Sequence, residues 1–110
     1  MTTVTFQKNA DGSYRGFVCK GHAGYAKGKQ PDIVCAAVSA LTISTVNALS
    51  DLAKEELECE TDDDTGYLKC EIKSNLQEKS VFLMDALVLG LQNISESYGS
   101  RYLQVKFKEV

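Results

Sequence analysis

The chain has 110 residues, of which 44% are hydrophobic, and its formal net charge at pH 7 is −3. This length predicts one domain, residues 1–110, with a single hydrophobic core, and the hydrophobic content is too high for a disordered chain. The acidic balance argues against a dedicated nucleic-acid-binding protein, which is usually basic, but it does not exclude a basic protein as substrate.

The N-terminus, M-T-T-V-T-F, lacks the basic region and the apolar run of a signal peptide. We also find no apolar stretch that reaches the ~18 residues needed to span a bilayer. We therefore expect a cytoplasmic protein that makes no contact with a membrane. In that compartment the four cysteines are expected to be reduced thiols.

A β-hairpin is predicted at the start of the chain. Residues Thr2–Lys8 alternate apolar and polar side chains, which is typical of a strand with one buried face. Residues 9–12, N-A-D-G, are typical turn residues, so 13–20 should return as the second strand. Gly16 within that strand indicates a bulge or the close approach of another backbone.

The stretch Gly21–Leu41 holds the only histidine, His22, the only proline, Pro31, and one of the four cysteines, Cys35. Pro31 cannot continue a helix from before it, and Asp32 is a good N-cap, so a helix is predicted to begin at residue 33. Cys35 would then lie in the first turn, where the free N–H groups and the helix dipole favour negative charge. Thiols in such settings can have pKa values of roughly 3.5–7.5 and act as nucleophiles.

A dyad of Cys35 and His22 is one interpretation of this stretch. The glycine-containing loop could fold His22 back over the helix start, where it would hold the thiol proton, and the N–H groups of Cys35 and Ala36 could form an oxyanion hole. Asp32 would act as a cap or would orient His22. Other interpretations remain open, namely a solvated loop histidine, a small core cysteine, and a zinc ligand pair at Cys19 and His22.

Two segments, G-H-A at 21–23 and D-I-V-C-A-A-V-S-A-L at 32–41, resemble the two halves of the signature of the ribosomal-processing cysteine protease family. The order of elements along the whole chain is also similar to that family. The resemblance implies that His22 is the general base and Cys35 the nucleophile, with the Asp of the second half at Asp32. It also implies a ribosomal protein precursor as peptide substrate, because the family removes an N-terminal extension from a large-subunit ribosomal protein.

The helix that follows is predicted over residues 33–53. Its small residues would allow close packing, and Ser39, one turn after Cys35, is either a packing residue or a hydrogen-bond donor to the site. The apolar residues that fall near one stripe of this helix are Val34, Ala37, Val38, Leu41, Leu49 and Leu52.

A second hairpin is predicted from alternating residues at 55–61 and 67–72. Its loop at 62–66 contains three consecutive aspartates, which lack the other ligands of a calcium loop, so we interpret them as a solvated turn. Three cysteines in strand-like segments are expected to be buried and free: Cys19, Cys59 and Cys70.

The second long helix is predicted to follow a capping box at 74–77 and to run to about Tyr98, with Gly99 at its C-terminal end. It is apolar on more than one face. The apolar residues beyond the face that meets the sheet would be buried either within the chain, between layers of secondary structure, or against another subunit. We predict a homodimer. A last strand is predicted over 101–108, with three inward apolar residues: Leu103, Val105 and Phe107.

This ββαββαβ order predicts the α+β class, with a mixed, mostly antiparallel sheet and two helices packed on it. The predicted function is a cytoplasmic cysteine endopeptidase that uses Cys35 and His22 and needs no metal or organic cofactor. Three glycines would let the loop open and close over a peptide: Gly21, Gly24 and Gly28.

Two alternative functions remain open. A non-catalytic ribosome-associated binding protein would use the loop as a docking surface, with Lys27 and Lys29 contacting phosphate. A thiol-based redox protein would use Cys35, although the sequence offers no obvious resolving cysteine.

Overall fold

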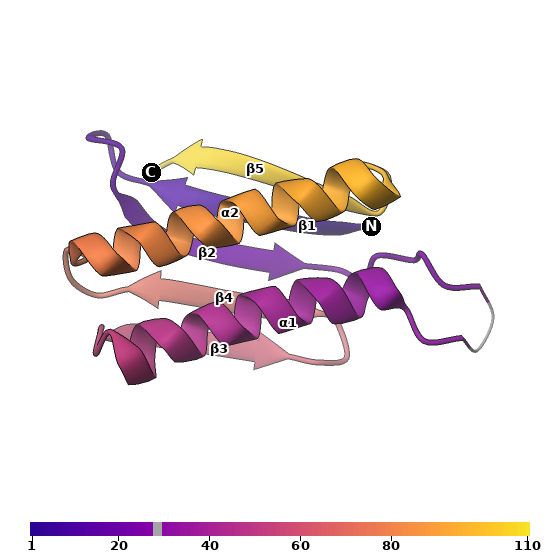
Figure 1. Ribbon diagram of the computed structural model, residues 1–110, viewed down its shortest axis with the longest axis horizontal. Helices are drawn as coiled ribbons and strands as arrows, with labels where there is room; N and C mark the ends of the chain where they lie inside the picture. Colours follow the sequence, from indigo (N-terminus) through magenta and orange to yellow (C-terminus); the bar gives the residue numbers. More distant parts are fainter. Residues whose placement is uncertain (28–29) are drawn as a thin grey trace.

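Two helices lie across one face of a five-stranded sheet in the computed structural model, which describes residues 1–27 and 30–110 (Figure 1). The elements in chain order are β1 (Thr2–Lys8), β2 (Tyr14–Lys20), α1 (Ile33–Asn47), a π-helical segment (Ala48–Leu52), β3 (Leu57–Asp62), β4 (Tyr67–Ile72), α2 (Glu78–Tyr98) and β5 (Leu103–Glu109). The predicted α+β class and element order are confirmed.

The strand order in the sheet is β3-β4-β2-β1-β5. All neighbouring pairs are antiparallel except β1 and β5, so the sheet is mixed and mostly antiparallel, as predicted. Gly16 is the close approach expected from the sequence, because a Cβ there would lie 2.3 Å from the carbonyl oxygen of Cys70 on β4. This order brings the β3–β4 hairpin beside the end of β2, where His22 follows.

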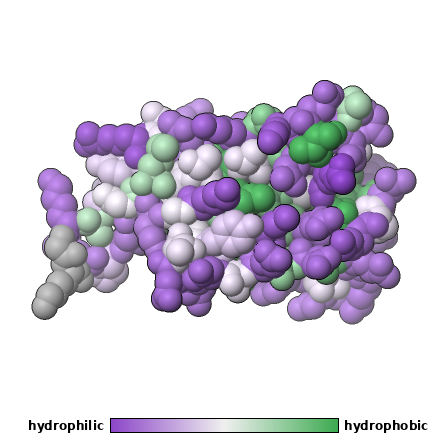
Figure 2. All heavy atoms as spheres, turned by 180° about the vertical axis from the view of Figure 1, so that it is seen from behind, coloured by the Kyte–Doolittle hydropathy of each residue, from purple (hydrophilic) through white to green (hydrophobic). Residues whose placement is uncertain are grey.

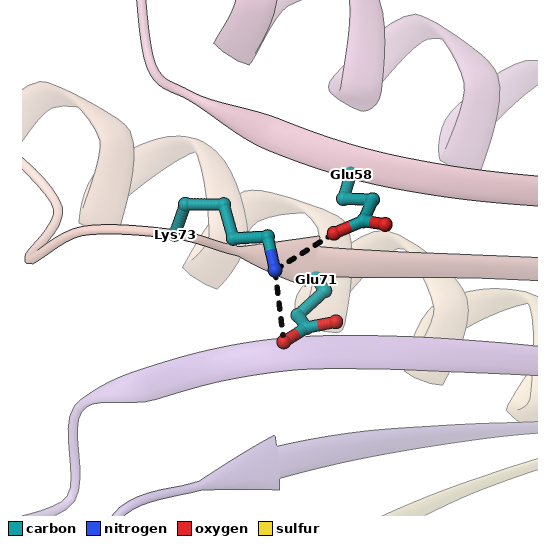
Figure 3. Close-up of polar contacts among 3 residues, drawn as sticks. All are labelled: Glu58, Glu71 and Lys73. Atoms are coloured by element: carbon teal, nitrogen blue, oxygen red, sulfur yellow. Dashed lines mark ion pairs between the residues drawn. The ribbon is translucent and has the colours of Figure 1, made fainter.

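The hydrophobic core lies between the helices and one face of the sheet. The largest fully buried side chains come from the strands, the π-helical segment and α2: Phe6, Phe17, Leu49, Met84, Leu87, Leu91 and Leu103. The opposite face carries mainly hydrophilic side chains (Figure 2). There Lys73 lies 2.7 Å from a carboxylate oxygen of Glu58 on β3 and 3.4 Å from one of Glu71 on β4 (Figure 3). Because these groups are exposed, the ion pairs add little stability.

Two predictions about burial were wrong, each on an edge strand. Cys59 is exposed because β3 is an edge strand. Phe107 is 50% exposed because β5 is the other edge, although its ring still stacks on Phe6 at a centroid distance of 5.8 Å. In addition, Leu52, predicted near the apolar stripe of the first helix, lies in the π-helical segment and is 77% exposed.

The predicted capping box before α2 was also wrong. The helix begins at Glu78 with Gln77 as its N-cap residue. The side-chain amide of Gln77 donates to the carbonyl of Ala53 at 2.8 Å, and its backbone N–H donates to the carboxylate of Glu55 at 3.0 Å. These contacts tie the start of α2 to the segment that follows α1. A tertiary contact therefore takes the place of a local cap.

The expectation that no apolar stretch is long enough to span a bilayer was wrong for one segment. Ile33–Leu52 is a continuous helix of 20 residues with a mean hydropathy of 1.8. Serines and threonines interrupt the apolar residues of this segment, but its alanines and valines still keep the mean hydropathy high. By length and composition alone this helix meets the criterion of a membrane span, which some helices of soluble proteins also meet. Here α1 lies on the sheet beside α2, and 22% of the stretch is buried (Figure 1).

Candidate active site

Asp32 forms the N-cap of α1, as predicted. Its Oδ1 accepts hydrogen bonds from the N–H groups of Val34 and Cys35, both at 3.0 Å. Its Oδ2 accepts from Tyr25 at 2.9 Å and from Ala26 at 3.4 Å. Burial opposes ionisation, but these four N–H groups outweigh it and hold the pKa of the Asp32 carboxyl below its usual value. One carboxylate therefore fixes both the helix start and the preceding loop.

Cys35 lies in the first turn of α1, as predicted, and its side chain is partly buried. The backbone N–H of Ala23 donates to its Sγ at 3.1 Å. Ala23 itself is buried in the core. The sulfur thus lies in the first turn of α1 and accepts a hydrogen bond from the loop that contains His22.

His22 lies in the loop that follows β2, as the sequence predicted. Its side chain is exposed, and Nε2 lies 3.1 Å from the main-chain carbonyl oxygen of Asp64. Asp64 belongs to the β3–β4 hairpin loop, 42 residues further along the chain. The ring is therefore held by a segment that the sequence analysis treated only as a solvated turn.

A cleft of about 150 Å³ brings the predicted site residues together. It lies between the start of α1, the end of β2 and the β3–β4 hairpin. Both His22 and Cys35 line it, as does Ser39, the residue expected one turn after the cysteine. Cys19 also lines the cleft, and burial raises the pKa of its thiol to about 11, with a further contribution from the neighbouring Cys35.

Two roles expected from the sequence, an oxyanion hole at the start of α1 and the orientation of His22 by Asp32, are not found in the structure. The N–H of Cys35 donates to the Asp32 carboxylate, and the N–H of Ala36 donates to the Asp32 carbonyl at 3.0 Å. Both groups are thus already hydrogen-bonded and do not form the predicted oxyanion hole. Asp32 does not orient His22 either, because its two oxygens bind the cap and the loop, and the imidazole hydrogen bond goes to Asp64.

An aromatic cluster that the sequence analysis missed anchors the loop before α1. The ring of Tyr25 packs edge-to-face on Tyr98 at 5.3 Å and on Tyr102 at 5.0 Å. These two tyrosines lie at the end of α2 and just before β5. Their i and i+4 spacing was visible in the sequence, but nothing local connects them to residue 25.

The residues proposed for the alternative functions are only partly described. Lys27 is exposed on the loop, whereas Gly28 and Lys29 lie outside the described residues. Within residues 1–27 and 30–110, no group of three His, Cys, Asp or Glu side chains lies together as a possible metal site.

A thiol at a helix start and an imidazole that share one cleft are the two groups that a cysteine-type hydrolase requires. The chain matches the sequence profile of the cysteine protease Prp family over residues 1–104. It belongs to this family, which confirms the predicted class of cysteine-type endopeptidase.

Relatives support this assignment along most of their length. The ribosomal processing cysteine protease Prp of Bacillus subtilis is 30% identical over 102 residues, which cover 89% of this chain and 90% of that protein. Two crystal structures of the essential ribosomal processing protease Prp from Staphylococcus aureus share the fold. The complex with a covalently linked product peptide has a TM-score of 0.88 and 27% identity, covering 98% of this chain and 100% of that one. The complex with a substrate peptide has a TM-score of 0.85 and 26% identity, with the same coverage.

Proposed function

We propose that this endopeptidase removes the N-terminal extension of a large-subunit ribosomal protein, with Cys35 as nucleophile and His22 as general base. The observation that carries the proposal is the shared cleft, in which Cys35 lies at the helix start and His22 on the facing loop. The relatives add the substrate class, since they are ribosomal processing proteases and two of their structures hold a substrate or product peptide.

In the proposed mechanism, Cys35 Sγ attacks the carbonyl carbon of the scissile bond while His22 takes the thiol proton. His22 then returns the proton to the leaving amine, and a thioester joins the acyl group to the enzyme. Water hydrolyses the thioester and restores the thiol. The N–H groups of Cys35 and Ala36 are already hydrogen-bonded to Asp32. The donor that can stabilise the oxyanion is therefore the Ala23 N–H, whose nitrogen lies 3.1 Å from the reacting sulfur and which can shift to the oxyanion as it forms.

These steps use only side chains, one backbone N–H and water, so the mechanism requires no metal or organic cofactor. We infer a cytoplasmic enzyme from the proposed ribosomal protein substrate. The net charge of −3 suits a basic ribosomal protein better than nucleic acid.

Alkylation by iodoacetamide tests whether Cys35 is the activated thiol. We expect Cys35 to react fastest of the four cysteines at pH 7, because His22 lines the same cleft and would accept the thiol proton. The His22→Ala variant should slow this reaction at Cys35 alone. Mass spectrometry of each cysteine against time, between about pH 6 and pH 9, measures both effects.

The other cysteines serve as internal controls for this experiment. Burial, with smaller contributions from Cys59, raises the pKa of the Cys70 thiol to about 12, and burial raises that of Cys19 to about 11, so both should stay unmodified in the folded protein. Cys59 is exposed outside the cleft and gives the reference rate. A Cys35 rate that equals the Cys59 rate and does not change in His22→Ala would contradict the proposed dyad.

We also propose that the protein is a homodimer. Large apolar side chains are exposed on the outer surface of the helices, notably Ile43, Leu52, Phe82 and Leu89. Phe82 and Leu89 lie seven residues apart on α2 and therefore share one face of it. Burial of this face in a second copy would remove an apolar surface from water.

Sedimentation velocity at micromolar concentration should show a particle of twice the chain mass. Phe82→Asp should convert it to a monomer, because a charge would then be buried in the interface. Val110→Asp introduces the same charge at an exposed apolar residue away from the helices and should leave the dimer intact. A wild-type protein that sediments as a monomer across this concentration range would contradict the dimer.

A further inference from the structure

The hydrogen bond between His22 and Asp64 fixes which imidazole nitrogen carries the proton. The Nε2 atom lies 3.1 Å from the carbonyl oxygen of Asp64, and a carbonyl oxygen can only accept a hydrogen bond. Nε2 must therefore be the N–H nitrogen when this contact is made. In the neutral ring the other nitrogen, Nδ1, then holds the free lone pair.

Packing of the hairpin loop against the loop of His22 supports this contact. Gly66 has a φ of +65°, and a Cβ at this position would lie 2.5 Å from the carbonyl oxygen of Gly21 and 3.1 Å from Cε1 of His22. The same carbonyl of Gly21 accepts a hydrogen bond from the Thr2 hydroxyl at 3.1 Å, which holds it from the side of β1. Glycine at 66 thus lets two backbone segments meet where the imidazole is attached.

We propose that the β3–β4 hairpin positions the general base: the Asp64 carbonyl holds His22 in the Nε2–H tautomer, so that Nδ1 exchanges the proton with Cys35. This inference rests on the proposed function of His22 and Cys35. Asp64 and Gly66 are positioning residues, since they act through His22 and not on the substrate. A ring free to rotate or to change tautomer would present the wrong nitrogen for part of the time, and each such state is inactive.

The hairpin position also explains why a main-chain group suits this role. His22 and Asp64 are both exposed, so water competes for their hydrogen bond. A carbonyl held by a hairpin next to β2 loses no side-chain rotamer freedom when it binds the ring. The Asp64 side chain is not needed for the contact, and Asp64→Ala should leave the tautomer unchanged.

Two glycine variants separate this contact from the general effect of backbone strain. Gly66→Ala places a methyl group against Gly21 and His22, and it also forces alanine into a left-handed conformation. Gly12→Ala forces the same kind of strain in the β1–β2 hairpin, where φ is +86° and a Cβ would meet no described atom within 4 Å. Any difference between the two variants therefore reports the contact at the site.

Nitrogen NMR of the imidazole gives a direct readout, because His22 is the only histidine of the chain. At a pH where the ring is neutral, the wild type and Gly12→Ala should show the Nε2–H tautomer as the main form. Gly66→Ala should shift the ring toward a tautomer mixture and lower kcat for peptide cleavage roughly 10- to 100-fold. Circular dichroism should show that both variants keep their fold.

A backbone change provides a second test in case Gly66→Ala does not fold. Replacing Thr65 by its α-hydroxy acid converts the 64–65 amide to an ester, which weakens the Asp64 carbonyl as an acceptor without changing its shape. The tautomer should shift in this protein too. The inference would be overturned if the wild type showed the Nδ1–H tautomer, or if the ester protein had the same tautomer ratio of His22 as the wild type. Because NMR requires no turnover, this result is independent of whether Cys35 proves to be the nucleophile.

Discussion

Cys35→Ala is expected to abolish peptide cleavage and to leave peptide binding intact. The substitution removes the sulfur that forms the thioester, and the other thiol in the cleft, Cys19, stays protonated because burial raises its pKa to about 11. Loss of a nucleophile in other hydrolases lowers kcat by about 10⁴-fold or more, so the residual rate should approach the background. The fold should tolerate the change, because Cys35 is only partly buried and alanine is a good helix former.

A precursor peptide and a matched cysteine variant make the result specific. Cleavage followed by mass spectrometry gives kcat, and fluorescence anisotropy of a labelled peptide gives its Kd. Cys59→Ala also removes one thiol, but from an exposed edge strand, and should cleave at the wild-type rate. If Cys35→Ala cleaves normally, the nucleophile lies elsewhere. If neither the wild type nor the variant cleaves but both bind, the chain is the binding protein that the sequence left open.

The start of α1 could be predicted because the signals are local. Pro31 and Asp32 act within one turn of the helix, and the position of Cys35 follows from them. The element order could be predicted for a similar reason, since alternation and helical periodicity are read within short windows. The family signature then connected His22 with Cys35, which spacing alone did not.

The surroundings of His22 could not be predicted because they depend on the order of strands in the sheet. The β3–β4 hairpin reaches His22 only because β4 pairs with β2, and the two contacting residues are 42 positions apart. The same applies to Tyr25 and its two aromatic partners. Exposure of Cys59 and Phe107 is likewise a consequence of edge positions, because each side chain faces the core side of a strand that has a neighbour on one side only.

Asp32→Ala should weaken both the fold and the catalytic site. The substitution removes the helix cap, which typically costs about 1–2 kcal/mol of the free energy of unfolding. It also frees the N–H groups of Tyr25 and Ala26, which hold the loop next to His22. Misplacement of a general base by about 1 Å can cost about 100-fold in rate, so kcat should fall by a similar factor.

Asp32→Asn separates these two effects. The Asn side-chain oxygen can still accept from Val34 and Cys35, and Asn is as good an N-cap as Asp. Its NH₂ group, however, would face the N–H groups of Tyr25 and Ala26 and cannot accept from them. The variant should therefore lose less stability in urea than Asp32→Ala, because the helix cap is kept, while its kcat falls as in Asp32→Ala.

Asp11→Asn is the matched control, because Asp11 also accepts a backbone hydrogen bond, from Ser13 at 2.9 Å, but lies in the β1–β2 hairpin. Its kcat should equal that of the wild type. An Asp32→Asn enzyme with wild-type kcat would show that the loop contacts of Oδ2 are not needed for catalysis.

The difference in the free energy of unfolding between the wild type and Asp32→Ala should become smaller as the pH is lowered. Because the pKa of Asp32 is lower in the folded protein than its usual value, the carboxylate stabilises the fold fully above the usual carboxyl pKa of about 3.9. This contribution is lost as the pH falls through the lowered pKa of the folded state. Urea unfolding should thus give a constant difference from about pH 7 to pH 5 and a smaller one below about pH 4. A difference that stays constant into strong acid would mean that the cap acts through the neutral oxygen alone, and that the charge of Asp32 does not hold the loop.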